Sequence, residues 1–366
     1  MATKSEVVES SFRLGSGRYI QEEGATLLLG DEVLRLGCKK PFILAGKTAW
    51  SLAEKKIKAS LKEKDIPLNY YIYEGFCNPD HCDRILASEA FRGCDCLVGV
   101  GGGNLMDATK LCAAKANLPV INIPTSSATC AAYTPLSVMY NDKFQTIGSQ
   151  HHLKEVNCIL VDMDILCRQP VRLLVSGVYD SLAKLIETTQ RLDGKTEEEI
   201  DIGLRSSFVL SDFIYKRLLA DLPAACESVR RGENTKAIYD TVYLTICVTG
   251  IISALARGSN QCSIAHKIYE STRVIFPSES KTWLHGELVA IGLLAQLYYN
   301  GEEETAKVFR SQMRSVGMPV TLAEIGIPDT DKTMETYYNE VASTPMMDGV
   351  SAEELQKLRR SLEEMR

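Results

Sequence analysis

The segment GVGGGNLMDATK, residues 99–110, has the residue types of a phosphate-binding turn between a strand and a helix. Gly101, Gly102 and Gly103 let the backbone turn sharply and approach a ligand without a Cβ clash. The first N–H groups of the following helix, together with its dipole, would favour a pyrophosphate at this point. A tight turn with nothing bound fits the three glycines equally well, and the motif is not the GxGxxG fingerprint.

A hydroxyl-rich segment favours the ligand-binding interpretation. Thr125, Ser126 and Ser127 directly follow the apolar run LPVINIP, residues 118–124. Ligands of open α/β sheets bind at the carboxyl ends of the strands. Two neighbouring loops, one rich in glycine and one in hydroxyls, would therefore form a nucleotide cradle.

The chain has only five histidines, and two of them lie in apolar, helical surroundings. These are His266, in SIAHKIYE, and His285, in WLHGELVAIG. A histidine in such a place is more often a hydrogen-bonded core residue than a metal ligand. His81, His151 and His152 lie in polar segments, and we expect them at the surface.

Asp180, in SGVYDSLAKLIE, is a further candidate ligand in helical, apolar surroundings. It has two other interpretations: it caps a helix that starts near Ser181, or it pairs with Lys184 one turn further on. Spacing alone does not bring Asp180 and the histidines together.

The elements that must position these residues change in kind near residue 165. Before that point, short apolar runs alternate with helical patterns, which predicts a parallel sheet covered by helices. The expected strands are 41–46, 70–75, 96–100 and 118–124, with helices at 48–64, 80–93 and 105–117. Residues 137–162 are predicted to form two strands joined by a polar excursion. Strand signals then vanish, so we expect an α/β domain over 1–164 and an all-α domain over 165–366.

Composition limits the class of protein. The 366 residues are 45% apolar and 24% charged, which suits a two-domain globular chain. A net charge of −6 without a basic run argues against a nucleic-acid partner. No signal peptide and no continuous apolar stretch of about 18 residues are found, so we expect a cytoplasmic protein without a membrane partner. The twelve cysteines are scattered and form no CxxC pair, which fits a reducing compartment and no disulfide framework.

Five segments, in this order, make the chain resemble the iron-containing alcohol dehydrogenases of the glycerol-dehydrogenase-like branch. They are GGGNLMDATK, IPTSSATCAAYTPLSVMYND, GVYDSLAKLIE, AHKIYESTRV and WLHGELVAIG, and they span nearly the whole sequence. Within that branch, ATCAAYTPLSVMYND is most similar to the hydroxycarboxylate dehydrogenase subgroup. The resemblance implies a Rossmann-like, dehydroquinate-synthase-like N-terminal sheet, an all-α C-terminal domain, an active site in the cleft between them, and a homo-oligomer.

The resemblance also implies roles for individual residues. Asp180, His266 and His285 would hold one divalent metal. The cofactor NAD(P)H would be contacted by residues of the glycine turn and of the segment after it. These are Gly101, Gly102, Gly103, Asn104, Asp107, Thr125, Thr134, Leu136 and Tyr140.

Four departures from the resembled enzymes refine these expectations. Lys184 stands where the iron enzymes carry a histidine, which favours zinc on three protein ligands, with iron as the alternative. Cys130 stands where glycerol dehydrogenases have an acid, and Asn104 where they have a lysine. The missing acid weakens the case for glycerol and suits an anionic oxo acid. At the end of the first strand, Lys47 replaces an acid and would accept a 2′-phosphate, which favours NADP(H) over NAD(H).

The expected reaction is reversible hydride transfer between NAD(P)H and a small carbonyl compound, with a 2-oxo acid and its 2-hydroxy acid preferred. Lys184 either pairs with the substrate carboxylate or is a solvated or Asp-paired lysine, and Cys130 would line the pocket. Glycerol or another polyol is the alternative substrate. A dehydroquinate-synthase-like lyase is a further alternative, although such an enzyme would carry Glu at position 180.

Overall fold

The structure of the protein is a computed structural model that describes residues 15–257 and 261–366. The described chain forms two compact units. The first contains residues 15–174 and 220–254, and the second contains residues 175–219 and 255–366. The helical segment 220–254 therefore belongs to the first unit by its contacts, although the sequence places it beyond the α/β part. The predicted domain division at 164/165 stays a prediction.

The first unit is built on a six-stranded parallel sheet, which confirms the predicted fold class. Its strand order is β1-β8-β5-β4-β2-β3. β2, β4, β5 and β8 are buried along their whole length, because parallel strands are covered on both faces. The strands are β1 (Tyr19–Glu22), β2 (Pro41–Ala45), β3 (Asn69–Ile72), β4 (Cys96–Gly101), β5 (Val120–Pro124) and β8 (Cys158–Asp162).

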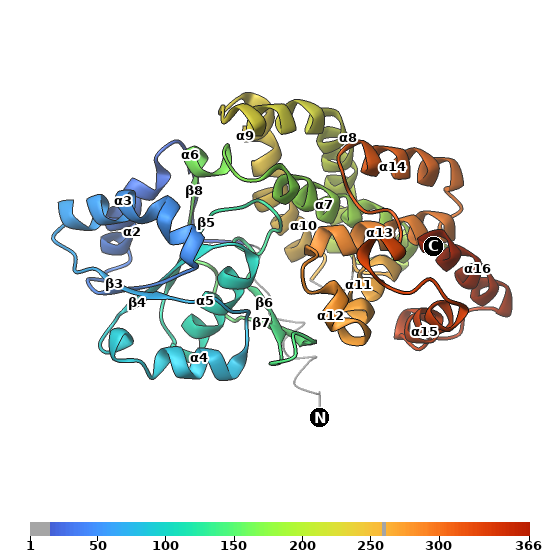
Figure 1. The fold of residues 1–366 in the computed structure, drawn as a ribbon, viewed down its shortest axis with the longest axis horizontal. Helices are drawn as coiled ribbons and strands as arrows, with labels where there is room; N and C mark the ends of the chain where they lie inside the picture. The colour runs from blue at the N-terminus through green and yellow to red at the C-terminus, as the bar shows by residue number, and fades with distance from the viewer. Residues whose placement is uncertain (1–14, 258–260) are drawn as a thin grey trace. The chain divides into compact units, whose positions relative to one another are not determined.

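Helices connect the parallel strands, with α3 on one side of the sheet and α4 and α5 on the other (Figure 1). α4 begins after Asn78, whose side chain caps the N–H groups of Asp80 and His81. α5 ends at Asn117, which takes the left-handed conformation of a C-cap. The helical elements between β1 and residue 166 are η1 (Ala25–Leu28), α2 (Leu29–Arg35), α3 (Lys47–Glu63), α4 (Pro79–Leu86), η2 (Glu89–Phe91), α5 (Gly103–Ala116) and α6 (Met163–Leu166).

The segment after β5 differs from its prediction. It contains three strands rather than two, because the expected polar excursion itself forms β7 (Thr146–His151), which pairs antiparallel with β6 (Leu136–Tyr140). β7 is exposed along most of its length, so it lacks the apolar alternation from which a strand is predicted. This hairpin is a separate two-stranded sheet.

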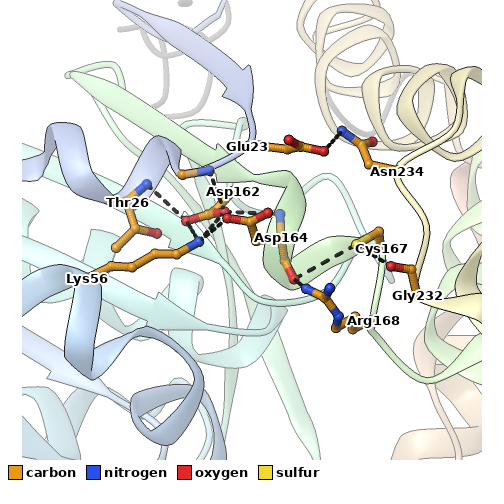
Figure 2. Close-up of polar contacts among 10 residues, drawn as sticks. Glu23, Thr26, Lys56, Asp162, Asp164, Cys167, Arg168, Gly232 and Asn234 are labelled. Atoms are coloured by element: carbon orange, nitrogen blue, oxygen red, sulfur yellow. Dashed lines mark hydrogen bonds and ion pairs between the residues drawn. The ribbon is translucent and has the colours of Figure 1, made fainter.

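A partly buried ion cluster fixes the carboxyl end of β8 (Figure 2). Asp162, fully buried, accepts hydrogen bonds from the backbone N–H groups of Gly24 and Thr26. Lys56 of α3 lies 2.8 Å from Asp162 and 2.6 Å from Asp164. One lysine therefore ties α3 to β8 and α6, while Asp162 holds the loop after β1.

The second unit is helical, and every regular element that the structure describes after Asp162 is a helix. α7 (Val171–Leu192), α11 (Ile264–Ile275) and α13 (His285–Tyr299) carry the candidate metal ligands. The remaining elements are η3 (Glu197–Glu199), α8 (Ile202–Arg231), of which residues 220–231 belong to the first unit, α12 (Pro277–Ser280), α14 (Glu303–Ser315), η6 (Ala323–Ile325), α15 (Asp331–Ala342), η7 (Pro345–Met347), α16 (Ala352–Leu362) and η8 (Glu363–Met365).

One segment has the length and hydropathy of a membrane span. In Lys236–Leu255, helix α9 (Lys236–Tyr243), a π-helical turn (Leu244–Val248) and α10 (Thr249–Leu255) follow one another, with a mean hydropathy of 1.6. In the fold, 61% of this apolar window is buried within the protein, as in a core helix. The expectation that no membrane is involved stays a prediction.

Candidate metal and dinucleotide sites

Three side chains from three helices of the second unit converge on one point. The ligand-type atoms of Asp180, His266 and His285 all lie within 4.8 Å of one another. Asp180 Oδ1 is 3.1 Å from His285 Nε2 and 3.7 Å from His266 Nε2. The structure therefore brings together the carboxylate and the two imidazoles, although 105 residues separate Asp180 from His285 in the chain (285 − 180).

The helices explain how each side chain is placed. Asp180 lies in the middle of α7, so it is not the N-cap of a helix that starts at Ser181. His285 is the first residue of α13, and Gly286 follows it. A Cβ on Gly286 would lie 1.9 Å from the carbonyl oxygen of Ser176, so glycine alone lets α13 approach the backbone of α7 so closely.

The residues around His285 hold its ring and the turn that precedes it. The ring of Tyr269, on α11, packs edge-to-face against the His285 ring, with the ring centres 4.2 Å apart. Arg273, one turn further along α11, donates hydrogen bonds to the carbonyl oxygens of Ser280 and Trp283. The guanidinium thus fixes the chain between α12 and α13 just before the histidine.

Asp180 is almost fully buried, at 4% exposure, and its Oδ1 accepts no hydrogen bond from the described residues. Burial opposes its ionisation, but its interactions with His285, Lys184 and His266 outweigh this and hold the pKa of Asp180 well below its usual range. A buried carboxylate oxygen without a hydrogen-bond donor is costly unless a cation meets it. The set of one carboxylate oxygen and two imidazole nitrogens fits a divalent metal.

Among the residues that the structure describes, two other groups of ligand-type atoms are as compact, but they suit a metal less well. In the group Cys38–Asp95–Cys96, burial raises the pKa of both thiols, which disfavours the thiolates that bind metals. In the group Glu187–Cys262–His266, burial raises the pKa of Cys262 to about 12. In the same group, Nδ1 of His266 is hydrogen-bonded to Oε2 of Glu187.

Glu187 is a part of this site that the sequence analysis missed. Its side chain is fully buried, and its Oε2 lies 2.5 Å from Nδ1 of His266. Its Oε1 accepts the backbone N–H groups of Ser263 and His266, each at 2.8 Å. Burial alone would raise the pKa of Glu187, but His266 and these backbone donors outweigh it and lower that pKa. The sequence signal was present, since Glu187 is seven residues after Asp180 and lies on the same face of α7.

Lys184 lies between these two acids on α7 and is 6% exposed. Its charge is among the causes that lower the pKa of Asp180. A buried ammonium one turn from the ligand set is therefore a feature of this site, as the sequence allowed.

In the first unit, the glycine turn forms the predicted link between β4 and α5. Gly101 ends β4, Gly102 is the N-cap residue of α5, and Gly103 begins the helix. The N–H of Thr125 donates to the carbonyl oxygen of Gly101 at 2.9 Å, so the glycine-rich and hydroxyl-rich loops lie side by side. A Cβ on Gly103 would lie 2.8 Å from Oγ1 of Thr129. A larger residue at position 103 would therefore force Thr129 to shift.

Lys110 fastens the rest of the predicted cofactor segment to α5. Its ammonium, 3% exposed, donates to the carbonyl oxygens of Ala131, Thr134 and Leu136 and pairs with Asp107 at 2.9 Å. Asp107 Oδ2 also accepts the N–H of Val138 at 3.2 Å. These bonds make Asp107 and the backbone of residues 131–138 one connected piece, and a cofactor contact by Asp107 stays a prediction.

The other predicted cofactor and pocket residues differ in exposure. Lys47 and Asn104 are exposed, each at the N-terminal end of a helix that follows a strand. Tyr140 is buried and stacks on Phe144, with the ring centres 5.0 Å apart. Cys130 is partly exposed, and its carbonyl oxygen accepts the N–H groups of the turn at 133–134.

The three remaining histidines differ in their exposure to solvent. His151 is exposed, as expected. His152 is not, because its Nε2 lies 2.8 Å from Oγ of Ser137 and its Nδ1 is buried without a hydrogen bond. His81 is also mostly covered, with Tyr73 OH 2.7 Å from its Nδ1. Both are packed polar residues rather than surface ones, a difference that arises from tertiary contacts.

Comparison with known proteins gives the class to which this fold and these sites belong. The model of the iron-containing alcohol dehydrogenase family matches residues 16–162. Glycerol dehydrogenase of Citrobacter freundii is 30% identical over 314 residues, which cover 85% of this chain and 84% of that protein. Hydroxycarboxylate dehydrogenase A of Escherichia coli (strain K12) is 26% identical over 315 residues, 86% of this chain and 85% of that protein.

The fold is shared with solved structures. Glycerol dehydrogenase from Schizosaccharomyces pombe superposes with a TM-score of 0.82, 24% identity, and coverage of 95% of this chain and 89% of that one. The chain belongs to the iron-containing alcohol dehydrogenase family and is an oxidoreductase. That family binds NAD(P) and a divalent metal.

Proposed function

We propose that this oxidoreductase transfers a hydride reversibly between NAD(P)H and a small carbonyl compound, and that its preferred pair is a 2-oxo acid and the matching 2-hydroxy acid. In the reductive direction, the carbonyl carbon takes the hydride and its oxygen takes a proton, which gives the alcohol and NAD(P)⁺. The observation that carries the proposal is the convergence of Asp180, His266 and His285 on a point where a buried carboxylate oxygen accepts no hydrogen bond from residues 15–257 or 261–366.

Asp180, His266 and His285 would hold the metal, with zinc favoured and iron as the alternative. One carboxylate and two neutral imidazoles form a ligand set that suits zinc, and the fourth family position is Lys184 rather than a histidine. When bound, such a metal supplies Lewis acidity toward a substrate oxygen. Lys184 cannot coordinate as an ammonium, so three protein ligands would leave room for substrate.

The dinucleotide would bind at the carboxyl ends of β4 and β5. The N-terminus of α5 offers free N–H groups for the pyrophosphate, and glycine at position 103 places no side chain beside them. Exposed Lys47, at the end of β2 next to β4, would pair with a 2′-phosphate. We therefore favour NADP(H) over NAD(H).

The 2-oxo acid preference rests on Lys184 and Cys130. A buried ammonium one helical turn from Asp180 would pair with a substrate carboxylate. Cys130 brings no negative charge, whereas glycerol dehydrogenases have an acid there. A glycerol or polyol substrate is the second candidate, because the relative of Citrobacter freundii at 30% identity is a glycerol dehydrogenase.

A substrate panel tests this proposal. The purified protein is stripped with a chelator, refilled with zinc or with iron, and assayed with NADPH and NADH against 2-oxo acids, neutral aldehydes and, in reverse, glycerol. We expect the highest kcat/KM with a 2-oxo acid and NADPH. Lys184→Met should raise the KM for the oxo acid by roughly 10- to 100-fold, the worth of a charged hydrogen bond, and barely change that for a neutral aldehyde. Inactivity across the whole panel would contradict the dehydrogenase proposal.

A further inference from the structure

We infer that Glu187 is a positioning residue that fixes the tautomer of His266, so that the bare Nε2 of this ring faces Asp180. The inference rests on the proposed function, since it assumes that His266 Nε2 is a metal ligand. It goes beyond it by assigning the residue that sets the state of the ligand.

The two ring nitrogens of His266 face different partners. His266 Nδ1 lies 2.5 Å from Glu187 Oε2, and Nε2 lies on the side of Asp180, 3.7 Å from its Oδ1. A carboxylate only accepts hydrogen bonds, so the Nδ1 that meets Glu187 must carry the proton. A neutral imidazole with its proton on Nδ1 has its lone pair on Nε2, which is the form that ligates.

Backbone hydrogen bonds fix the position of Glu187 itself. Its Oε1 accepts two backbone N–H groups, those of Ser263 and His266, both at 2.8 Å. These groups belong to the free N-terminal end of α11, where no intrahelical acceptor exists. The carboxylate thus caps α11 with one oxygen and orients a side chain of that helix with the other.

Only a carboxylate can accept the two backbone N–H groups with one oxygen and the Nδ1–H of His266 with the other. A glutamine at 187 would have one oxygen and one NH₂ group. If the oxygen kept the two backbone donors, the NH₂ would face Nδ1, and His266 would have to move its proton to Nε2. If the oxygen faced Nδ1, the NH₂ would meet two N–H donors. The first arrangement keeps more hydrogen bonds, so Glu187→Gln should switch the tautomer.

A neighbouring residue gives a control for the capping role alone. Gln296 of α13 accepts the N–H of Ile264 at 2.9 Å and donates to Gln190 and Asn300. It supports the same end of α11, and the structure gives it no hydrogen bond to the His266 ring. Gln296→Met removes this cap while keeping the length of the side chain.

Two measurements test the inference. The first is long-range ¹H–¹⁵N correlation of the metal-free protein labelled with ¹⁵N-histidine, which reports the protonated nitrogen of each of the five rings. In the wild type and in Gln296→Met, we expect a proton on Nδ1 of His266; in Glu187→Gln, we expect it on Nε2 only. The second is zinc affinity by competition with a chromophoric chelator. Glu187→Gln should weaken it about 10- to 100-fold, and Gln296→Met less than about threefold.

The outcomes separate this inference from the proposed function. A bare Nδ1 in the wild type, or Glu187→Gln with an unchanged tautomer and zinc affinity, would overturn the positioning role of Glu187. Equal losses in Glu187→Gln and Gln296→Met, with the tautomer unchanged in both, would reduce Glu187 to a helix cap and also overturn it. The variant His285→Ala tests the metal site independently: if it binds zinc as the wild type does, the proposed ligand set itself is wrong.

Discussion

Asp180 Oδ1 and His285 Nε2 lie 3.1 Å apart at the meeting point of α7 and α13. The carboxylate is buried and the imidazole is partly exposed, at 26%. This pair lies next to a second imidazole, and Asp180 Oδ1 accepts no hydrogen bond from the described residues. A buried carboxylate oxygen beside two imidazoles is the arrangement that a cation-binding site requires.

Asp180→Asn should abolish most of the stabilisation that zinc gives. The amide keeps the shape of the carboxylate but loses its charge, so zinc affinity should fall on the order of 100-fold or more. Zinc at about 100 times its Kd should stabilise the wild type by about 2.7 kcal/mol, visible as a rise in Tm, and the variant by far less. Asp212→Asn, an exposed acid of α8 paired with Lys216, is the control and should respond to zinc as the wild type does. A full zinc-induced rise in Asp180→Asn would count against this carboxylate as a ligand.

Gly286→Ala tests whether close helix packing positions His285. The new methyl would lie 1.9 Å from a backbone oxygen that cannot move aside, so α13 must shift away from α7. We expect a loss of about 3 kcal/mol in the free energy of unfolding, from urea titrations, together with weaker zinc binding.

Gly46→Ala is its control, because a Cβ there would lie 3.8 Å from Ala49 in an unstrained backbone. That change should alter stability by less than about 1 kcal/mol. Gly286→Ala with wild-type stability and zinc affinity would show that the packing does not matter for the ligand.

Gly103→Ala tests the dinucleotide cradle. The methyl would lie 2.8 Å from Thr129 Oγ1, which should cost about 1–2 kcal/mol of stability. Adding Thr129→Ala removes that overlap and should restore most of the stability. Dinucleotide affinity, followed by NADPH fluorescence, should stay at least about tenfold weaker in the double variant, because the methyl still stands at the N-terminus of α5. Wild-type affinity in the double variant would move the pyrophosphate away from this turn.

Much of the first unit was predictable from local pattern. The strands β2, β4 and β5 were found within two residues, because each is a short apolar run buried on both faces. The strand predicted at 70–75 is β3 (Asn69–Ile72), which ends three residues earlier and is largely exposed. β7 was missed because its exposed residues carry no such pattern. β1 has only four residues and pairs with β8, which begins 139 residues after Tyr19 (158 − 19), so no local signal marks it.

The site was predictable only in part. Nothing in the spacing of Asp180, His266 and His285 requires them to meet, and the family resemblance supplied the set. Glu187 was missed because a buried glutamate on an apolar helix face looks like many others until its partner, on a helix far away in sequence, is known. The attachment of residues 220–254 to the first unit likewise depends on long-range contacts.

Stability should depend on pH through His152. Burial, followed by the charges of Lys110 and His151, lowers the pKa of His152 to about 3, against an ordinary value of 6.5. The unfolded chain then binds a proton that the folded chain refuses, so stability is complete above pH 6.5 and declines as the pH falls toward 3.

His152→Gln removes this titration while it keeps a hydrogen-bond partner for Ser137. Between pH 7.5 and 4.5, the wild type should lose on the order of 2 kcal/mol more than this variant, after a discount for partial exposure of the ring. Any contribution from His151 is common to both proteins and cancels. Parallel pH profiles for the two proteins would show that His152 is protonated equally well in the folded state.

X-ray absorption at the zinc edge of the zinc-loaded protein is the most direct test of the central claim, because it separates nitrogen and oxygen ligands from sulfur. If Asp180, His266 and His285 hold the ion, the spectrum should show only light ligands at about 2.0–2.1 Å, with the multiple scattering of two imidazoles. That imidazole signal should fall by half in His285→Ala. A shell of sulfur at about 2.3 Å would place the ion on some of the twelve cysteines and contradict the account.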